Sequence, residues 1–354
     1  MRCPSLAEIP PPLYGKTGWP WTLESQNLPE SMPDGNPWPK LSIVTPSFNQ
    51  GCFIEETIRS VLLQGYPNLE YMILDGGSTD NTVEIIRRYE SWLSHWVSER
   101  DKGQASAINK GWSTARGQIL GWLNSDDVYA SDAFCAVAKA WCEAGRPGMA
   151  YGDAFSTNVR LHPLKKKRMN SYSLSVMLLG KRMPQPAVFI CKDLFSTLGP
   201  LDESLYYSLD FDYFLRAWLQ PNAEKYCYVP RVLAYSRRYA DTKCQSGGWK
   251  RVEENVSVLK KIWNGRMQSY HGIREWRFGF ATALAIMAER YLDNGIPLKA
   301  IRLYREAFTW SPRVVSNVLR SLVRLFIRKL LRRPVFWRNA SSNASGKDLK
   351  IYMD

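Results

Sequence analysis

Segments with the patterns of strands and helices alternate between residues 41 and 124, and this alternation restricts the chain to few folds. Short apolar runs typical of buried strands occupy residues 41–49, 69–77, 94–99 and 118–124. Runs with apolar residues at helical spacing lie between them, at residues 53–64, 78–90 and 104–115. Such alternation predicts an α/β fold with a doubly wound, mostly parallel sheet. Sheets of this kind bind ligands beyond the carboxyl ends of their strands.

The pattern changes after residue 127 and divides the chain into four predicted parts. Further strands are expected at residues 149–154, 185–190 and 224–237, with a helix at 209–218, and the sequence is helical from residue 249 onward. The four parts are a Pro- and Trp-rich extension, an α/β domain, a helical region and a disordered tail. They cover residues 1–40, 41–245, 246–333 and 334–354.

The helical region has two features of its own. Residues 284–312 carry small and aromatic residues spaced like one tetratricopeptide repeat, which predicts a helical hairpin. In residues 314–333, apolar residues fall on one helical face and arginines on another. This pattern suits either a helix that lies on an anionic membrane surface or an amphipathic helix docked on the protein.

Charge and cysteine content limit the compartment and the partners. The net charge of +14 suits anionic partners such as phosphorylated ligands, nucleic acid or membrane surfaces. Seven scattered cysteines and three histidines argue against structural zinc and against a secreted disulfide framework. The N-terminal residues lack the apolar core of a signal peptide, and no apolar run is long enough to span a membrane. We therefore expect a cytoplasmic location, with peripheral attachment to the inner face of the cytoplasmic membrane as the alternative.

Polar residues stand where the predicted strands end. The strand at residues 118–124 runs into Asp126 and Asp127, and the strand at 69–77 ends in Asp75 and two glycines. Carboxylates are ligands that Mg²⁺ prefers, usually one or two together with substrate phosphates. For Asp127 the alternative is a turn that caps the following helix. The strand ends therefore predict a ligand site at one edge of the sheet.

Three motifs, in the right order and spacing, together resemble glycosyltransferase family 2, whose members are nucleotide-sugar enzymes with the GT-A fold. They are "LSIVTPSFNQGCFIEETIRSVLLQGYPNLEYMILDGGSTDNTVEII", "DKGQASAINKG" and "GWLNSDD", and the similarity covers about residues 41 to 245. The resemblance implies inverting transfer of a hexose from a nucleoside-diphosphate sugar to an acceptor hydroxyl, with Mg²⁺ or Mn²⁺ as cofactor. The acceptor would be a saccharide or lipid-linked saccharide used to build cell-surface or extracellular polysaccharide or glycolipid.

The resemblance also implies the donor-binding residues. These belong to the strand ends and the helix that follows them: Thr45, Pro46, Ser47, Asn49, Asp75, Gly76, Lys102, Asn109, Asn124, Ser125 and Asp127. Asp75 would contact the base, and Asp126 would coordinate the divalent cation. Asn124 stands where the family's Asp-x-Asp motif has its first Asp, so whether the metal is strictly required stays open.

The predicted helix at residues 209–218 would carry the acceptor side. "YSLDFDYFLRAW" resembles the family's Glu-Asp-x-Asp segment, with Leu209 in place of Glu, and Asp210 matches the catalytic base. Inverting transfer needs a base that takes the proton of the acceptor hydroxyl. A helix N-cap is the alternative role for Asp210. Gln185 and Asp212 would also lie on the acceptor side, although Asp212 has the spacing of an i,i+4 ion pair with Arg216.

Two basic segments allow a ligand-binding role or a surface role. Arg237, Arg238 and Lys243 would either close over phosphates from a mobile loop or form a solvated basic turn. Residues 165–168 are predicted to form a surface loop, which a phospholipid acceptor could meet.

Two other classes of function compete with the glycosyltransferase hypothesis. A nucleic-acid- or anionic-surface-binding protein would use the net charge of +14, but acidic loops would repel phosphate without a metal, and we expect no nucleic-acid partner. The other class is a different nucleotide-using α/β enzyme, such as a nucleotidyltransferase or a dehydrogenase. No GxGxxG motif follows the first predicted strand, which counts against a dinucleotide-binding fold.

Overall fold

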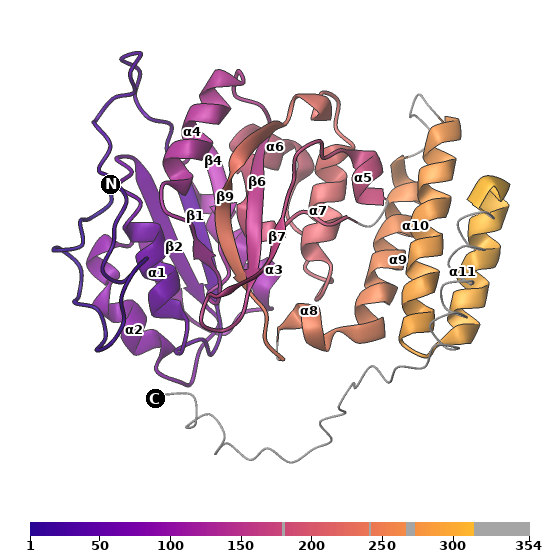
Figure 1. Cartoon of the computed structure of the whole chain (residues 1–354), viewed down its shortest axis with the longest axis horizontal. Coiled ribbons are helices and arrows are strands. Elements are labelled where there is room, and N and C mark those ends of the chain that lie inside the picture. The colour runs from indigo at the N-terminus through magenta and orange to yellow at the C-terminus, as the bar shows by residue number, and fades with distance from the viewer. Residues whose placement is uncertain (179–180, 241, 267–272, 315–354) are drawn as a thin grey trace.

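The structure is a computed structural model that describes residues 1–178, 181–240, 242–266 and 273–314 (Figure 1). Its centre is a nine-stranded sheet with the order β3-β2-β1-β4-β8-β6-β9-β5, in which β7 pairs with β6. Almost all of the basic helix predicted at residues 314–333, and the whole tail at 334–354, lie outside the described residues. Their proposed contact with a membrane or with the protein therefore stays a prediction.

The first half of the sheet is parallel, as the alternation predicts. It consists of β1 (Leu41–Ser47), β2 (Leu69–Asp75), β3 (His95–Ser98) and β4 (Ile119–Trp122). In the register of these strands, Ser47 lies beside Asp75 and Asp75 lies beside Ser98. The strands β1 and β4 are buried throughout, which is typical of a parallel sheet covered on both faces. The predicted α/β fold is confirmed.

The second half of the sheet mixes directions. It adds β5 (Val128–Tyr129), β6 (Met149–Thr157), β7 (Pro163–Lys167), β8 (Val188–Cys191) and β9 (Cys227–Arg237). The strand β8 runs antiparallel to β4 and β6, whereas β6 and β9 are parallel. The mixed pairing carries the end of β9 to the edge where β1, β2 and β4 end, because Val128 in β5 pairs with Tyr235.

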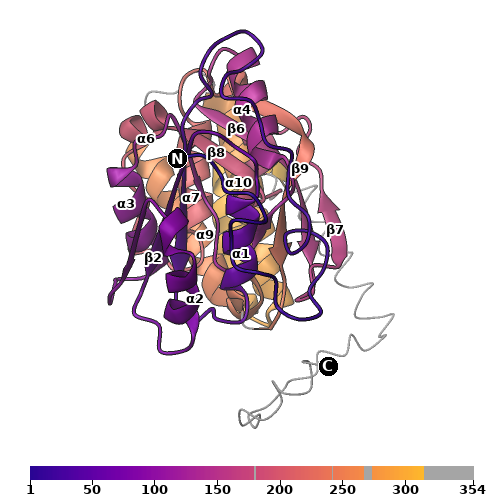
Figure 2. The ribbon, with the colours of Figure 1, turned by 90° about the vertical axis from the view of Figure 1, so that its left-hand side faces the viewer.

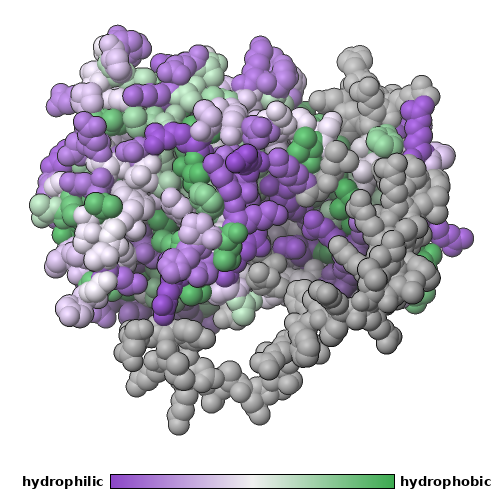
Figure 3. Space-filling model, viewed as in Figure 1, coloured by the Kyte–Doolittle hydropathy of each residue, from purple (hydrophilic) through white to green (hydrophobic). Residues whose placement is uncertain are grey.

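The lysine-rich segment is a strand, and the predicted surface loop is wrong for Lys165–Lys167. These lysines belong to β7, which pairs with β6 and is mostly exposed. An exposed edge strand has no buried face, so its sequence lacks the alternation that marks other strands. Its charges also oppose pairing with another chain. Hydrophilic residues gather over the middle of this side of the molecule, around the position of β7 (Figure 3).

Helices cover both faces of the sheet. One face packs against α1 (Ile54–Leu62), α2 (Thr82–Arg88) and α4 (Ala133–Glu143), and the other against α3 (Gln104–Thr114), α6 (Lys192–Leu198) and α7 (Leu209–Trp218) (Figure 2). Alternate residues of β1 serve the two cores, with Ile43 facing α1 and Val44 facing α3. Gly111 lets α3 approach the sheet closely, because a Cβ there would lie 2.6 Å from Val44.

The remaining helices stand beside α7 at one end of the molecule (Figure 1). They are α5 (Leu174–Leu178), α8 (Lys243–Ser246), α9 (Gly248–Arg266), α10 (Ile273–Asp293) and α11 (Pro297–Trp310). The helix α9 packs on α7, and α10 packs on α5, α9 and α11. The hairpin is predicted from small and aromatic residues of these helices, and Ala288, Tyr291, Ala300 and Ala307 among them are buried. None of the helices in the described ranges combines the length and apolar composition that crossing a bilayer requires.

The Pro- and Trp-rich extension packs on the α/β core through its aromatic residues. Trp21 is buried and its indole N–H donates to Glu56 in α1 at 2.7 Å, while Trp19 donates to the carbonyl of Tyr129 at 2.8 Å. Arg59 of α1 is completely buried beneath this segment, and it donates to three of its carbonyl groups, those of Pro10, Pro20 and Trp21.

Candidate active site

The carboxyl ends of β1, β2 and β4 meet at one edge of the sheet and bring the predicted polar residues together. Thr45 and Pro46 are inside β1, and the Thr45 hydroxyl lies 3.0 Å from that of Tyr71. Ser47 ends the strand, and its buried hydroxyl has no hydrogen-bond partner. Because buried polar atoms are nearly always paired, we expect a ligand bound at this edge to form a hydrogen bond with this hydroxyl.

The Asp75 carboxylate organises the turn after β2. It accepts hydrogen bonds from the amides of Gly77 and Ser78, at 3.2 and 2.9 Å, and from the hydroxyls of Ser78 and Ser98, at 2.5 and 2.6 Å. Two carboxylate oxygens offer about four acceptor positions. Three of these bonds go to Oδ2 and one goes to Oδ1, so Oδ1 keeps an acceptor position that a base N–H could use.

Asn49 and Gly76 tie the ends of β1 and β2 together. The Asn49 side-chain oxygen accepts from the backbone amide of Thr79 at 2.8 Å, and the backbone amide of Asn49 donates to the Ser78 hydroxyl at 2.7 Å. The Gly76 amide donates to the Ser47 carbonyl at 2.8 Å, and a Cβ at Gly76 would lie 3.2 Å from the carboxylate of Asp101. The two loops are thus one rigid wall of the site.

Hydrogen bonds from α1 and from the end of β9 hold the loop after β4. The hydroxyl of Thr57 in α1 donates to the carbonyls of Ser125 and Asp127, at 2.9 and 2.7 Å. Arg237, at the end of β9, donates its amide to the Asp127 carboxylate at 2.9 Å and its guanidinium to the Asp126 carbonyl at 2.5 Å. Asp126 is half-buried, and one of its carboxylate oxygens accepts from the Tyr239 hydroxyl at 3.0 Å.

Burial raises the pKa of both carboxylates of this loop. Desolvation is the main cause that raises the pKa of Asp126, and the Tyr239 hydrogen bond and the charge of Arg237 oppose it. For Asp127, burial and the neighbouring Asp126 raise the pKa to about 8. Two adjacent carboxylates with raised pKa values favour a bound cation, because a positive charge lowers the cost of ionising them.

A chain of hydrogen bonds runs from this loop to the far side of the site. Asn124 accepts from Gln104 at 2.6 Å and donates to Gln185 at 3.2 Å. Lys243 donates to Gln104 at 2.9 Å and to the carbonyl of Tyr206 at 3.3 Å. Residues of the loop after β4, of α3, of α8 and of the segment before α7 therefore surround one region.

Asp210 lies in the first turn of α7, and α9 shapes the segment that leads to it. The Glu254 carboxylate accepts hydrogen bonds from three consecutive amides, those of residues 206–208, at 2.7 to 3.1 Å. The Ser208 hydroxyl donates to Asn255 at 2.8 Å. One oxygen of Asp210 accepts from the amide of Phe211, and within the described ranges its other oxygen accepts no hydrogen bond. This half-buried oxygen is open to a ligand.

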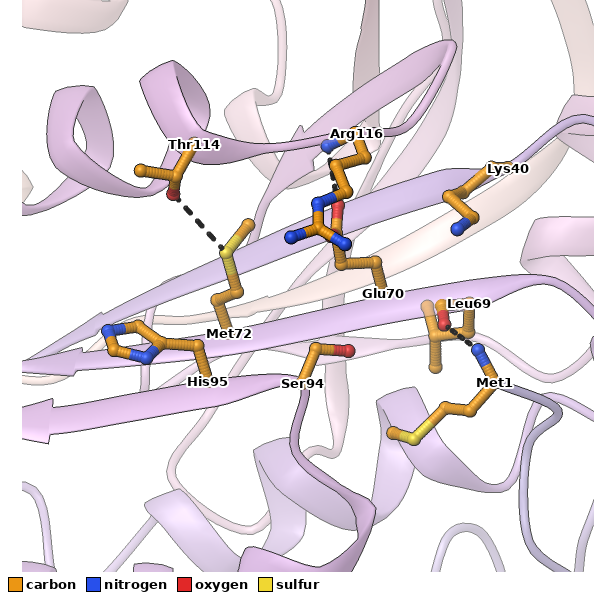
Figure 4. A pocket seen from close by; sticks show the side chains of 9 residues that line it. All are labelled: Met1, Lys40, Leu69, Glu70, Met72, Ser94, His95, Thr114 and Arg116. Carbon is orange, nitrogen blue, oxygen red and sulfur yellow. Dashed lines mark hydrogen bonds between the residues drawn. The ribbon is translucent and has the colours of Figure 1, made fainter.

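A separate pocket of about 420 Å³ opens at the opposite edge of the sheet (Figure 4). It lies among residues that begin strands, including Lys40, Glu70, His95 and Arg116. The Glu70 carboxylate in its wall accepts from the Ser42 hydroxyl and the Arg116 amide, at 2.5 and 2.7 Å. Because parallel α/β sheets bind ligands at the other edge, its size does not make it the active site.

Comparison with known proteins assigns the family. The model of the family described as Glycosyl transferase family 2 matches residues 42–192. An uncharacterized glycosyltransferase of Mycobacterium tuberculosis is 30% identical over 184 residues, which cover 51% of this chain and 70% of that protein. The chain belongs to glycosyltransferase family 2.

Two further relatives are named as glycosyltransferases, and one solved structure has a similar fold. A PGL/p-HBAD biosynthesis glycosyltransferase of M. tuberculosis is 28% identical over 189 residues, 52% of this chain and 71% of that protein. The putative teichuronic acid biosynthesis glycosyltransferase TuaG of Bacillus subtilis is 40% identical over 97 residues, 27% and 38% of the two chains. The structure of S. aureus TarS with UDP-GlcNAc covers 76% of this chain and 90% of its own, with a TM-score of 0.56 at 16% identity. The GT-A fold expected from the motifs is confirmed.

Three residues predicted for the family 2 site lie against the protein or away from the network. The Asn109 side chain binds the loop before α7, because its amide group donates to Leu201 and Glu203 and its oxygen accepts from the Leu201 amide. Asp212 is buried and pairs with Arg216 at 2.8 Å, the i,i+4 ion pair given as its alternative. Lys102 is exposed at the start of α3. Ligand contacts by these residues stay predictions.

The residues around Asp126 fit a divalent cation that is shared with a substrate. The described residues contain no group of three His, Cys, Asp or Glu side chains that could hold a metal by themselves. Mg²⁺ commonly takes one or two carboxylates and completes its shell with phosphate oxygens and water. Asp126 can supply one oxygen, whereas the Asn124 oxygen is already occupied by Gln104. A divalent cation on Asp126 would thus need further oxygen ligands from a bound ligand or water.

Sequence reasoning missed the residues that reach the site from distant segments. Glu254 and Asn255 belong to a helix whose sequence has no motif, and they contact residues 46 to 48 positions away. Gln104 lies inside the quoted "DKGQ" motif, so its place at the start of α3 offered a signal. Tyr239 follows Arg237 and Arg238, the arginines expected either to close over phosphates or to form a solvated basic turn. Arg237 is instead buried and pairs with Glu56.

Proposed function

We propose that this family 2 enzyme transfers a hexose with inversion from a nucleoside-diphosphate sugar to a hydroxyl of a cell-surface saccharide or lipid-linked saccharide. The names of its relatives support the acceptor class, since they refer to PGL/p-HBAD and teichuronic acid biosynthesis. The complex of TarS with UDP-GlcNAc supports a nucleotide-sugar donor.

The observation that carries the proposal is the hydrogen-bonded path from Asn124 through Gln104 and Lys243 to Tyr206. It links the loop of Asp126 with the segment before Asp210. Burial lowers the pKa of Lys243, while the charges of Glu254, Asp210 and Asp126 raise it, so both proposed carboxylates act on the ammonium group. A donor held at one end could meet an acceptor held at the other.

Each proposed role follows from the chemistry of the side chain. The wall formed by the ends of β1 and β2 would hold the nucleoside through Thr45, Pro46, Ser47, Asn49, Asp75 and Gly76. Asp126 would hold Mg²⁺ or Mn²⁺, which when bound stabilises the charge of the leaving diphosphate. Lys243 and Lys102 would attract the same charge. Asp210 would take the proton from the acceptor hydroxyl as that oxygen attacks the anomeric carbon.

The test separates donor binding from proton removal. The wild type is titrated by calorimetry with UDP, GDP and dTDP in the presence of Mn²⁺, and we expect one of the three nucleotides to bind. Asp210→Asn should bind that nucleotide with the same affinity as the wild type. Asp126→Asn should bind it at least tenfold more weakly, and the surface variant Asp132→Asn should match the wild type. With a cell-envelope extract as acceptor, Asp210→Asn should lower the rate of transfer by about 10²–10⁴-fold. Wild-type turnover by Asp210→Asn would overturn the assignment of the base.

A further inference from the structure

Three arginines from three separate segments carry charges that act on one another, and one of them contacts the first turn of α7. Arg182 precedes β8, Arg251 lies in α9 and Arg290 lies in α10. They are close enough that their charges oppose one another: burial is the main cause that lowers the pKa of Arg182 to about 10, and Arg290 and Arg251 lower it further. Burial and then Arg251 likewise lower the pKa of Arg290. Gathering like charges costs free energy, which neighbouring acidic groups or a bound anion can offset.

Arg182 contacts the residue that follows the proposed base in α7. Its guanidinium carbon is 4.0 Å from the centre of the Phe211 ring, and Phe211 follows Asp210 in α7. Asp210 is the carboxylate whose charge raises the pKa of Arg182, yet within the described ranges Arg182 forms no ion pair within 4.0 Å. Its Nη2 atom is buried and has no hydrogen-bond partner.

Two other buried arginines show how this chain treats a guanidinium with a structural role. Arg59 donates to three carbonyl groups and to the Tyr89 hydroxyl. Arg237 donates to the carbonyls of Val159 and Asp126 and pairs with Glu56. Every nitrogen of these two groups has a partner, as buried charged groups require. Arg182 differs from both, because one of its buried nitrogens is left for a ligand.

The charges around the three arginines favour an anion on the side of Arg182. Glu289 and Asp293 raise the pKa of Arg290 from its own helix and offset part of its charge. Glu254 of α9 is occupied by the amides of residues 206–208. A guanidinium binds phosphate oxygens through two parallel hydrogen bonds, and it is the usual choice where phosphate is recognised.

We propose that Arg182, Arg251 and Arg290 bind a phosphate group of the acceptor, next to the hydroxyl that Asp210 deprotonates. This inference rests on the proposed function. The acceptor is preferred over the donor because Arg182 contacts Phe211, next to the proposed base, whereas the contacts to Asp126 come from Arg237 and Tyr239. The acceptor would then be a phosphorylated saccharide, in which the phosphate is either a polymer phosphodiester or the link to a lipid.

The first experiment titrates the full-length protein with sn-glycerol 3-phosphate and with glycerol. We expect the phosphate to bind the wild type and glycerol not to bind. Arg182→Gln should weaken phosphate binding at least tenfold, and Arg87→Gln, which removes one charge from the surface of α2, should leave it unchanged. Arg290→Gln replaces Arg182→Gln if circular dichroism shows that the latter does not fold. Equal binding by wild type and a folded cluster variant, or no binding by the wild type, would overturn the inference.

The second experiment separates the two phosphate sources and the donor. A tenfold preference for polyprenyl phosphate in detergent micelles over empty micelles identifies a lipid-linked acceptor, and a preference for a glycerol-phosphate trimer identifies a polymer; each supports the inference. Binding of the nucleoside diphosphate with Mn²⁺ should be the same in Arg182→Gln and the wild type. A tenfold loss there would assign the arginines to the donor and overturn the inference. Absence of nucleotide binding in the wild type would instead contradict the proposed function.

Discussion

Replacing Asp127 by asparagine removes a buried negative charge from the loop after β4. Asp127 is 3% exposed, and its carboxylate accepts a hydrogen bond from the Arg237 amide at 2.9 Å. An asparagine oxygen can accept the same bond, so the substitution changes the charge and keeps the contact. The variant imitates the protonated carboxyl at every pH.

The pKa of Asp127 determines the direction of the effect. Burial and Asp126 raise it from an ordinary value of 3.8 to about 8 in the folded protein. Between these two values the folded state holds a proton that the unfolded chain releases. The contribution of Asp127 to stability is therefore full below about pH 4 and is lost as the pH rises to about 8. A shift of about four pKa units corresponds to at most roughly 5–6 kcal/mol, and relaxation of the loop reduces this.

The assay is urea unfolding of wild type and Asp127→Asn in EDTA between about pH 4 and 8. The two proteins should have similar free energies of unfolding at the acid end. At about pH 8 the variant should be more stable by roughly 2–4 kcal/mol, and exposed Asp132→Asn should show no such trend. A wild type that gains stability relative to Asp127→Asn as the pH rises would refute the reasoning.

Two further substitutions test the supports of the site. Glu254→Gln should lower the transfer rate by at least tenfold with little change in nucleotide affinity. The reason is that the three amides of residues 206–208 lose a charged acceptor, worth about 1.5–3 kcal/mol for each hydrogen bond. Steady-state kinetics measures the effect, and equal kinetics in Glu254→Gln and the neighbouring surface control Glu253→Gln would contradict it. Arg237→Gln should lower the free energy of unfolding by about 1–3 kcal/mol, since it removes the buried guanidinium that pairs with half-buried Glu56 and leaves that carboxylate only its bond from Trp21. Urea unfolding measures the loss, and a loss no larger than that of Arg238→Gln would show that the buried contacts contribute little.

The spacing of apolar residues predicted those helices and strands whose structure depends on residues close by in the sequence. The helix expected at residues 209–218 is α7 with the same bounds, and the four parallel strands lie where their apolar runs are. The edge strand β7 could not be found in this way, because lysines exposed on both faces carry no period-two signal. The two-residue strand β5 is likewise too short to show a period.

The candidate site could be predicted only as far as its local turns. Asp75, Asp126 and Asp210 each follow a recognisable run and lie at strand or helix ends. The contacts that position them come from far along the chain: Tyr239 reaches Asp126 across 113 residues, and Glu254 holds the segment before Asp210. Such contacts depend on the packing of whole elements, which no short pattern encodes.

The central claim is that Asp126 and Asp210 serve one donor and one acceptor in a single site. The most direct measurement is a crystal structure of the protein with Mn²⁺ and the nucleoside diphosphate that binds most tightly, with the metal located from its anomalous scattering. The account predicts Mn²⁺ coordinated by Asp126 and the diphosphate, with the base near Asp75 and the open oxygen of Asp210 facing the space beyond the phosphates. A metal bound away from Asp126, or a nucleotide in the pocket at the opposite edge of the sheet, would contradict it.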